Sequence, residues 1–359
     1  MNRKTAIVPL NGLPAQQHRA ARSDVLAWSY FSPARQSHGA LPMRFKRERV
    51  LVIGCGDVAM RLIRQRARAA DAKDTAAAAT STHRIWRALT SRPEQVVPLR
   101  ELGVMALVGN LDQPGTLRRL AGLATRVLHL APPTTTGMAD GRTRALLRSL
   151  RCSGHAVRSL AYVSTTGVYG DCHGAWVSES QPVAPVNARA FRRVDAEQQV
   201  RALARQGVGA TVLRAPGIYA FDRPNGSPLS RLEKGTPVLE AGDDVFTNHI
   251  HAEDLARACW LALWRGRAGR IFNANDDSAL LMGDYFDCVA KAMHWPAPPR
   301  ISRAQAQQTM SALQMSFLSE SRRMSNQRIK RELRLAWHYP DVGVAVAQYL
   351  QLKGANAKP

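Results

Sequence analysis

Short apolar runs alternate with stretches of helical periodicity through most of the chain. The apolar runs predict strands over 49–54, 85–90, 104–108, 126–131, 159–164, 210–213 and 270–273. The stretches between them predict helices over 57–70, 93–102, 114–122, 139–151 and 188–206. Strands with so few polar residues are typical of a sheet that is covered on both faces. The regular alternation of strand and helix therefore predicts an α/β fold with a doubly wound parallel sheet.

The turn after the first predicted strand carries a Gly-x-Gly-x-x-Ala motif, which ends at Ala59. In such a turn the first glycine allows a tight bend and the second lets the backbone approach a pyrophosphate. The helix that follows offers free N–H groups and the positive end of its dipole to the phosphates. This strand, turn and helix predict a dinucleotide site in a Rossmann fold. The residues expected to bind the cofactor here are Gly54, Cys55, Gly56, Asp57 and Val58, with the Asp57 side chain capping the helix and pointing away.

The end of the second strand indicates which dinucleotide binds. An acid at this position binds the 2′-hydroxyl group of NAD, whereas an arginine accommodates the 2′-phosphate of NADP. Asp71 and Asp74 lie at the usual sequence distance from the glycines, but they fall in an alanine-rich stretch. The strand itself ends at Ser91 and Arg92, a hydroxyl and a guanidinium group that suit a phosphate. We therefore expect NADP, with NAD as the alternative.

The rest of the chain divides into further segments. Residues 1–46 are expected to be disordered, or a mis-assigned extension with translation beginning at Met43, although their basic, acid-poor composition also resembles a transit peptide. Residues 47–213 would form the cofactor domain, with a low-complexity insertion at 71–83. Residues 214–340 would form a small substrate-binding cap, from which a strand near 270–274 returns to the sheet. A C-terminal helix and tail would follow over 341–359.

The composition limits the kinds of partner that we expect the protein to bind. The chain has 359 residues, with 50 Lys+Arg against 27 Asp+Glu and a net charge of +23. Because the arginines are scattered, we favour genome bias together with a small anionic substrate over nucleic acid. The basic cluster from Arg322 to Arg334 is expected to be a solvated face. Five cysteines without Cys-x-x-Cys spacing argue against a disulfide framework and a zinc site, and suit the cytoplasm. No apolar run is long enough to predict a membrane span, so no membrane partner is expected.

Several further motifs occur in a specific order: Gly109-Asn110-Leu111-Asp112, His129-Leu130-Ala131-Pro132-Pro133, Tyr162-Val163-Ser164-Thr165-Thr166-Gly167-Val168-Tyr169-Gly170, Leu213-Arg214-Ala215-Pro216-Gly217-Ile218-Tyr219 and Asn248-His249-Ile250-His251-Ala252-Glu253-Asp254. With these motifs the chain resembles the extended short-chain dehydrogenase/reductases from Val50 to about Tyr339. It is most similar to the atypical bacterial subgroup called NAD-dependent epimerase/dehydratase. The resemblance implies that Thr165 is the catalytic hydroxyl residue. It also implies cofactor contacts for Asn110, Leu111, Ala131, Pro132, Pro216, Gly217 and Ile218.

The chain departs from this family at the residues that move the proton. The family uses Tyr-x-x-x-Lys on the helix after the Thr165 strand, and the corresponding residues here are Arg189 and Arg193. Arg193 could still hold a ribose hydroxyl group, but an arginine is a poor general acid at neutral pH. Tyr169 is the nearest phenol and the candidate for the acid/base role. The predicted catalytic set is Thr165, Tyr169 and Arg193.

Two functions remain open. The first is an NADP-dependent oxidoreductase or nucleotide-sugar epimerase/dehydratase-like enzyme with a degenerate Tyr-x-x-x-Lys site. The alternative is a non-catalytic NADP(H)-binding redox sensor or scaffold, because a fold alone does not establish activity. Both have a small molecule as partner, and neither fixes whether the chain forms a homodimer.

Overall fold

The computed structural model of the chain describes residues 47–71, 84–151, 157–224 and 226–356. The expectations for residues 1–46 and for nearly all of the insertion at 71–83 lie outside these described residues. We describe below only the part that begins at Arg47.

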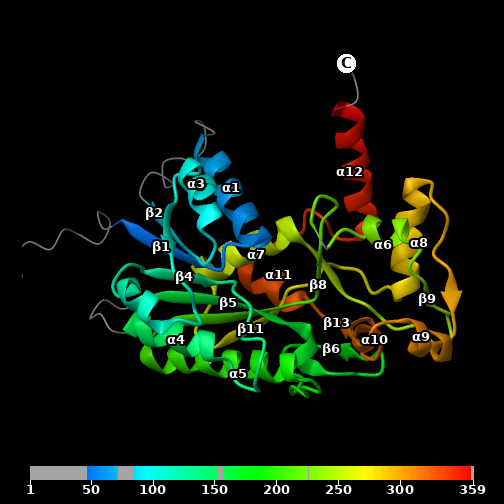
Figure 1. Ribbon diagram of the computed structural model, residues 1–359, viewed down its shortest axis with the longest axis horizontal. Helices are drawn as coiled ribbons and strands as arrows, with labels where there is room; N and C mark the ends of the chain where they lie inside the picture. Colours follow the sequence, from blue (N-terminus) through cyan, green and yellow to red (C-terminus); the bar gives the residue numbers. More distant parts are fainter. Residues whose placement is uncertain (1–46, 72–83, 152–156, 225, 357–359) are drawn as a thin grey trace, which may run out of the picture. The chain divides into compact units, whose positions relative to one another are not determined.

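A seven-stranded sheet forms the centre of the fold, in the order β11-β7-β5-β4-β1-β2-β3 (Figure 1). The strands are β1 (Glu48–Ile53), β2 (Arg84–Thr90), β3 (Met105–Val108), β4 (Arg126–His129), β5 (Ser159–Thr165), β7 (Gly209–Ala215) and β11 (Arg270–Asn273). Every neighbouring pair in this sheet is parallel. The predicted doubly wound α/β fold is therefore confirmed. In this order β2 and β3 lie on one side of β1, whereas β4 and the later strands lie on the other. Ligands of such sheets bind at the switch point between β1 and β4, where the strand order reverses.

Helices cover both faces of the sheet, as the apolar strands require. Along β1, Val50 and Val52 belong to the cluster on one face, whereas Leu51 and Ile53 belong to the cluster on the other. The first face is covered by α1 (Asp57–Asp71), α3 (Val96–Glu101), α7 (Ala252–Arg265) and α11 (Gln327–Leu333). The second is covered by η3 (Pro114–Leu120), α4 (Gly141–Arg151) and α5 (Ala188–Ala202) (Figure 1). This alternation buries both sides of the strand and fixes its register.

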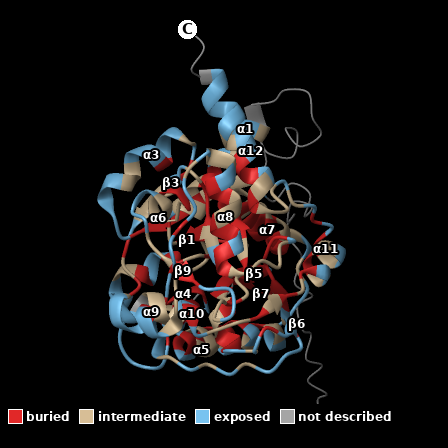
Figure 2. Ribbon diagram, turned by 90° about the vertical axis from the view of Figure 1, so that its right-hand side faces the viewer, coloured by how far each residue is buried: buried red, intermediate tan, exposed pale blue. Residues whose placement is uncertain are grey.

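The C-terminal part has a hydrophobic cluster of its own, which includes Tyr219, Val238 and Phe286. Its elements are β8 (Gly217–Tyr219), α6 (Leu229–Glu233), β9 (Val238–Leu239), β10 (His249–His251), α8 (Met282–Met293), β12 (Arg300–Ile301), α9 (Arg303–Thr309), α10 (Ala312–Leu318), β13 (Arg323–Met324) and α12 (Val342–Asn356). The short strand β6 (Trp176–Val177) pairs with β13, and this pairing joins a loop after β5 to the C-terminal part. Figure 2 shows buried residues on the strands and on the inner helix faces, and an exposed C-terminal end of α12.

Three of the predicted helices are wholly or partly 3-10 helices instead of α-helices. Residues 93–102 form a 3-10 turn, η2 (Pro93–Gln95), before α3 begins, and residues 114–120 form a 3-10 helix. The last helical turn before β7 is also 3-10, η5 (Leu203–Gln206). The fourth 3-10 element, η4 (Thr166–Tyr169), directly follows β5. Short 3-10 segments of this kind are common at helix ends and in connections.

The sequence predicts no disulfide framework, no zinc site and no membrane span, and the described residues give one observation on each. Cys55, Cys172, Cys259 and Cys288 are free thiols in the described part of the chain. Within the same residues, no group of three metal-ligating side chains comes together. None of the described helices combines the length and apolarity needed to cross a membrane.

Candidate functional site

The turn between β1 and α1 requires glycine at its first position. Gly54 has φ +87°, and a Cβ atom there would lie 2.5 Å from the backbone nitrogen of Ala131. Both the backbone conformation and the close approach of the β4 end therefore exclude a side chain. At Gly56, by contrast, a Cβ atom would meet nothing within 4 Å. The space over the second glycine is open toward the start of α1, where a pyrophosphate would need it.

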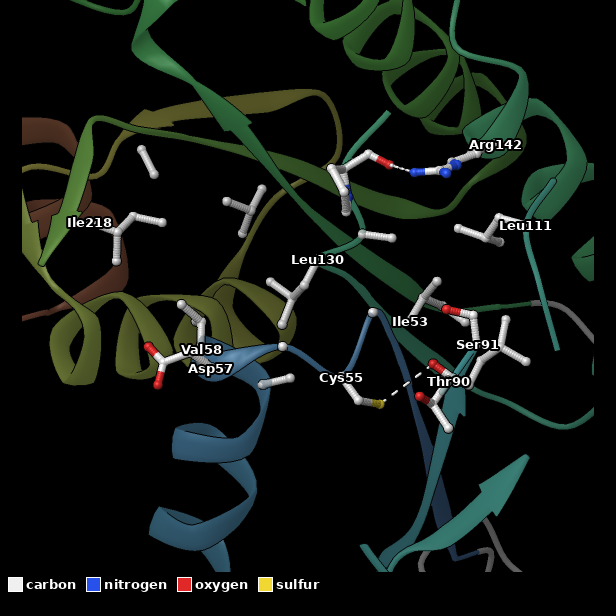
Figure 3. A pocket seen from close by; sticks show the side chains of 18 of the residues that line it. Ile53, Cys55, Asp57, Val58, Thr90, Ser91, Leu111, Leu130, Arg142 and Ile218 are labelled. Atoms are coloured by element: carbon white, nitrogen blue, oxygen red, sulfur yellow. Dashed lines mark hydrogen bonds between the residues drawn. The ribbon is translucent and has the colours of Figure 1, made fainter. Parts of the chain in front are cut away.

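A cavity of about 460 Å³ lies over this turn, at the carboxyl ends of β1, β2, β4, β5 and β7. All predicted cofactor-binding residues except Gly217 line it (Figure 3): Gly54, Cys55, Gly56, Asp57, Val58, Ser91, Arg92, Asn110, Leu111, Ala131, Pro132, Pro216 and Ile218. We call it the cofactor cavity. Sequence elements more than 150 residues apart meet there, from Gly54 to Ile218.

The carboxylate of Asp57 is held by two arginines and caps no helix. Its two oxygens accept hydrogen bonds from Nε of Arg61 at 2.9 Å and from Nε of Arg223 at 3.1 Å. Asp57 is itself the first residue of α1, so the expectation that it caps this helix is wrong. The two guanidinium groups offset its negative charge, which would otherwise oppose a phosphate in the same cavity.

The end of β2 presents no carboxylate to the cofactor cavity. Ser91 and Arg92 line it there, and Asp57 is the one acid among its described lining residues. Gln95 donates to the carbonyl oxygen of Cys55 at 2.8 Å, and Arg92 donates to the same oxygen at 3.3 Å. These contacts connect the end of β2 to the glycine turn. A guanidinium group therefore lies beside the turn, where an acid would be needed for an NAD-type ribose contact.

Arg142 of α4 is a lining residue that sequence reasoning missed. It donates from Nε and Nη2 to the two carboxylate oxygens of Asp112, at 2.7 and 2.6 Å. It also donates to the carbonyl oxygen of Pro132 at 3.2 Å (Figure 3). This fork links the Asn110-Leu111-Asp112 segment to the end of β4 and so fixes the wall of the cavity. No local signal marks Arg142, because its partners are 10 and 30 residues away.

A second cavity, of about 450 Å³, adjoins the first. Thr165, Arg193, Pro216, Ile218 and Arg223 line both. Its remaining walls come from η4, α5 and the C-terminal part, and Gly217 lies here instead of in the cofactor cavity. We call it the substrate cavity, because the sheet ends and the C-terminal part enclose it beside the cofactor cavity. It is lined by apolar rings, by arginines and by one carboxylate, Glu320.

Thr165 lies where the two cavities meet, at the end of β5. Its Oγ1 accepts a hydrogen bond from the backbone nitrogen of Gly167 at 3.3 Å, which caps η4. Because that contact uses an oxygen lone pair, the hydroxyl hydrogen is left to donate to a ligand. The fold therefore places the Thr165 hydroxyl group at the junction of the two cavities.

Arg193 also lies at the junction, and it is anchored from behind. Its Nη1 donates to the hydroxyl group of Tyr162 at 2.9 Å and to the carbonyl oxygen of Val163 at 2.8 Å. Tyr162 is fully buried, and burial raises the pKa of its phenol to about 12. The phenol therefore stays neutral near pH 7 and only positions the guanidinium group. Arg189, one helical turn earlier, lines the substrate cavity.

Tyr169 does not reach either cavity. Its side chain is 1% exposed, and its hydroxyl group donates to Oδ1 of Asn273 on β11 at 2.8 Å. Burial raises the pKa of this phenol, so it holds its proton. The prediction of an acid/base role for Tyr169 is therefore wrong, because the residue packs beneath the sheet end and not at the ligand side. Arg214, whose guanidinium lies 4.6 Å from the ring centroid, completes this buried arrangement.

Cys55 is a small filler in the glycine turn. Its side chain is 3% exposed, and burial raises the pKa of the thiol to about 12. A thiol with so high a pKa has almost no thiolate near pH 7 and is a poor nucleophile. Cys55 therefore contributes to the cofactor cavity through its small side chain and its backbone, and not through a reactive thiol.

The substrate cavity contains four charged residues that sequence reasoning did not place in a site: Arg223, Arg231, Glu320 and Arg322. Arg322 is 8% exposed and donates to Glu320 at 2.8 Å and to the carbonyl oxygen of Gly170 at 2.8 Å. It is thus a buried wall residue, and the expectation of a solvated face is wrong for it. These residues lie in loops and one short helix of the C-terminal part, where no sustained periodicity indicates which side chains turn inward.

Residues 106–274 match the model of the NAD dependent epimerase/dehydratase family. Among proteins with curated descriptions, no match was found. A solved structure described as a functionally unknown conserved protein from Silicibacter pomeroyi DSS is 28% identical, with a TM-score of 0.69. That match covers 85% of this chain and 99% of the other.

Two further solved structures are similar in fold. DesIV, a dTDP-glucose 4,6-dehydratase from Streptomyces venezuelae with NAD and TYD bound, is 20% identical, with a TM-score of 0.64 over 86% of this chain and 98% of that one. UDP-glucose 4-epimerase from Thermotoga maritima with UDP-glucose is 16% identical, with a TM-score of 0.64 over 85% and 99%. At these identities they show the fold alone. Together with the family match they confirm the predicted resemblance.

Proposed function

We propose that the chain is an NADP-dependent enzyme of the extended short-chain dehydrogenase/reductase type, because residues 106–274 match the model of the NAD dependent epimerase/dehydratase family. It would act as an oxidoreductase or as an epimerase/dehydratase-like enzyme on a small molecule. The observation that carries this proposal is the junction of the two cavities. There the Thr165 hydroxyl group and the Arg193 guanidinium group face a space continuous with the glycine turn.

Different residues of the cofactor cavity would contact different parts of a bound dinucleotide. Ser91, Arg92 and Asn110 lie at the β2 and β3 ends and would hold the adenosine part. The open space at Gly56 and the start of α1 would take the pyrophosphate. Pro216 and Ile218, at the β7 end, would hold the nicotinamide part. NADP is favoured over NAD because Arg92, and no acid, lies where the 2′-substituent is expected.

The chain's own residues supply positioning and charge. A bound nicotinamide would supply or accept the hydride at the junction. Thr165 would donate its hydroxyl hydrogen to a carbonyl or alcohol oxygen of the substrate, since its lone pair is used by Gly167. Arg193 would hold a ribose hydroxyl group from its anchored position on Tyr162. With Tyr169 buried, a water molecule would carry the proton.

A non-catalytic NADP(H)-binding sensor or scaffold is the second candidate. It is favoured by two observations: arginines stand at the family's Tyr and Lys positions, and the hydroxyl group of Tyr169 is bound to Asn273 outside both cavities. This candidate would retain the cofactor cavity and lack turnover. Fold similarity alone does not decide between the two.

Turnover with NADPH over a panel of carbonyl compounds and nucleotide sugars distinguishes them, after any co-purified ligand has been identified by mass spectrometry. We expect activity on at least one compound, and a loss of about 100-fold in kcat/KM in Thr165→Val, as for removal of one transition-state donor. Thr165→Ser, which keeps the hydroxyl group, should retain most of the activity. NADPH binding with no turnover on the whole panel would select the sensor, and full activity in Thr165→Val would contradict the assigned role.

A further inference from the structure

The substrate cavity is strongly cationic. Among the described residues, its lining includes the arginines Arg189, Arg193, Arg223, Arg231 and Arg322, against the single carboxylate Glu320. Two of these arginines are paired, because Arg322 binds Glu320 at 2.8 Å and Arg223 binds Asp57 at 3.1 Å. The other three guanidinium groups form no ion pair with a carboxylate among the described residues.

These three arginines come from two elements. Arg189 and Arg193 lie one turn apart on α5, whereas Arg231 belongs to α6. Arg189 stacks over Phe317 and Arg231 over Phe286, with the guanidinium carbon 5.2 and 4.8 Å from the ring centroids. Such stacking orients the planar guanidinium groups and leaves their charge unneutralised.

Of these three arginines, Arg231 is partly desolvated, whereas Arg189 is exposed. Burial lowers the pKa of Arg231, and the carboxylate of Asp244 opposes this effect from beyond ion-pair distance. Desolvating a cation without a partner is costly, and a bound anion would offset that cost. A cavity with this charge would therefore discriminate against neutral ligands.

Arg193 locates the anion relative to the chemistry. It lines both cavities together with Thr165, the proposed donor to the reacting oxygen. Its Nη1 is used by Tyr162 and Val163, which leaves Nη2 and Nε for a ligand. Arg189 lies one turn earlier on α5 and lines the substrate cavity alone.

On the basis of the proposed function, we propose that the substrate carries an oxyanion, a carboxylate or a phosphate, next to its reacting carbon. Arg193 and Arg189 bind this oxyanion, and Arg231 on α6 supplies further positive charge to the same cavity. The reacting end would thus be a hydroxy or oxo acid, or a phosphorylated alcohol, and not an uncharged sugar ring.

The test titrates the NADPH-saturated full chain by calorimetry with oxalate, inorganic phosphate and glucose. Saturation with NADPH keeps the small anions out of the cofactor cavity. We expect oxalate or phosphate to bind one-to-one and glucose not to bind. Arg189→Gln and Arg193→Gln should each weaken anion binding about tenfold or more, as loss of a charge-assisted hydrogen bond does. Arg193→Lys should keep part of the affinity, since it keeps the charge.

Arg201→Gln is the matched control, because Arg201 is exposed in the last turn of the same helix. It removes the same charge and should bind oxyanions like the wild type. Tighter binding of oxalate would indicate a carboxylate substrate, and tighter binding of phosphate a phosphorylated one. The proposal is overturned if neither oxyanion binds, if glucose binds as well as they do, or if Arg201→Gln weakens binding as much as Arg189→Gln.

The NADPH titration is evaluated separately. Failure of NADPH to bind would overturn the proposed function, whereas NADPH binding without anion binding would overturn only this inference. For Arg189→Gln and Arg201→Gln, unchanged NADPH affinity and an unchanged thermal unfolding curve show that the fold is intact. For the Arg193 variants, whose NADPH affinity should itself fall, the thermal unfolding curve shows this, and the anion titration is made at NADPH concentrations that saturate the variant.

Discussion

The guanidinium group of Arg193 on α5 is bound to the buried hydroxyl group of Tyr162 on β5, with 2.9 Å between Nη1 and the phenol oxygen. A residue that lies on the core side of the sheet thus positions a charge at the junction of the two cavities. Tyr169, seven residues further along, has a similarly buried hydroxyl group but donates it to Asn273, outside both cavities. The two tyrosines therefore form a natural pair for comparison.

We expect Tyr162→Phe to weaken NADPH binding severalfold, because Arg193 then keeps only the carbonyl oxygen of Val163 as an anchor. Tyr169→Phe should leave NADPH affinity unchanged. Each variant loses one buried hydrogen bond, so each should be destabilised by about 1 kcal/mol. Fluorescence titration with NADPH and denaturant unfolding measure the two effects. Equal NADPH affinities in both variants would show that the Tyr162 contact does not position Arg193.

Gly54→Ala should abolish cofactor binding and destabilise the fold. The added Cβ atom would lie 2.5 Å from the Ala131 nitrogen, at φ +87°. Strain of this kind costs on the order of 1–3 kcal/mol before the clash is added. Gly115→Ala is the control, because a Cβ atom at Gly115 meets nothing within 4 Å, and its effect should stay within about 0.5 kcal/mol. Wild-type NADPH affinity in Gly54→Ala would be inconsistent with a phosphate site at this turn.

Arg92→Ala should reduce the preference for NADPH. Loss of a guanidinium–phosphate contact should weaken NADPH binding about tenfold or more and leave NADH binding nearly unchanged. Arg118→Ala removes the same charge from an exposed position on η3 and serves as the control. Parallel losses for NADPH and NADH in Arg92→Ala would indicate that this residue does not contact a 2′-phosphate.

The protein should lose stability on acidification already at pH values higher than those at which ordinary carboxylates take up protons. Burial lowers the pKa of His129 and His249 to about 3 and that of His251 to about 4. Below about pH 6.5 the unfolded chain protonates these histidines and the native protein does not, so stability falls as the pH decreases.

Asp276 opposes this trend. Burial raises its pKa to about 8, so its native carboxyl keeps a proton that the unfolded chain releases above about pH 4. Three histidines against one aspartic acid leave about two excess protons on the unfolded chain between pH 5.5 and 4.5, or about 3 kcal/mol per pH unit. Urea unfolding at a series of pH values measures this slope. A stability that is independent of pH between 6.5 and 4.5 would contradict the burial of these histidines.

Most of the sheet could be predicted from sequence because each strand carries its own signal. Val50 to Ile53 are apolar on both faces, and the glycines that follow fix the turn within the same short segment. The cofactor cavity follows from such local signals, since parallel strands end at one edge of the sheet. Local turn chemistry and strand order together thus specify the residues that line it.

The substrate cavity could not be predicted in this way. Arg231 on the short helix α6 and Arg322 in the loop before β13 line it only because these segments of the C-terminal part fold back over the sheet end. Similarly, the burial of Tyr169 depends on Asn273, which is 104 residues away on β11. A single sequence gives no signal for such pairings, so spacing alone suggested a catalytic role for a residue that is structural.

The most direct test of the cofactor cavity is a calorimetric titration of the full chain with NADPH and with NADH. We predict one site per chain for NADPH, with NADH binding about tenfold or more weakly because of Arg92. If neither coenzyme produced any binding heat and neither raised the thermal stability of the protein, the assignment of this cavity to a nicotinamide dinucleotide would be wrong.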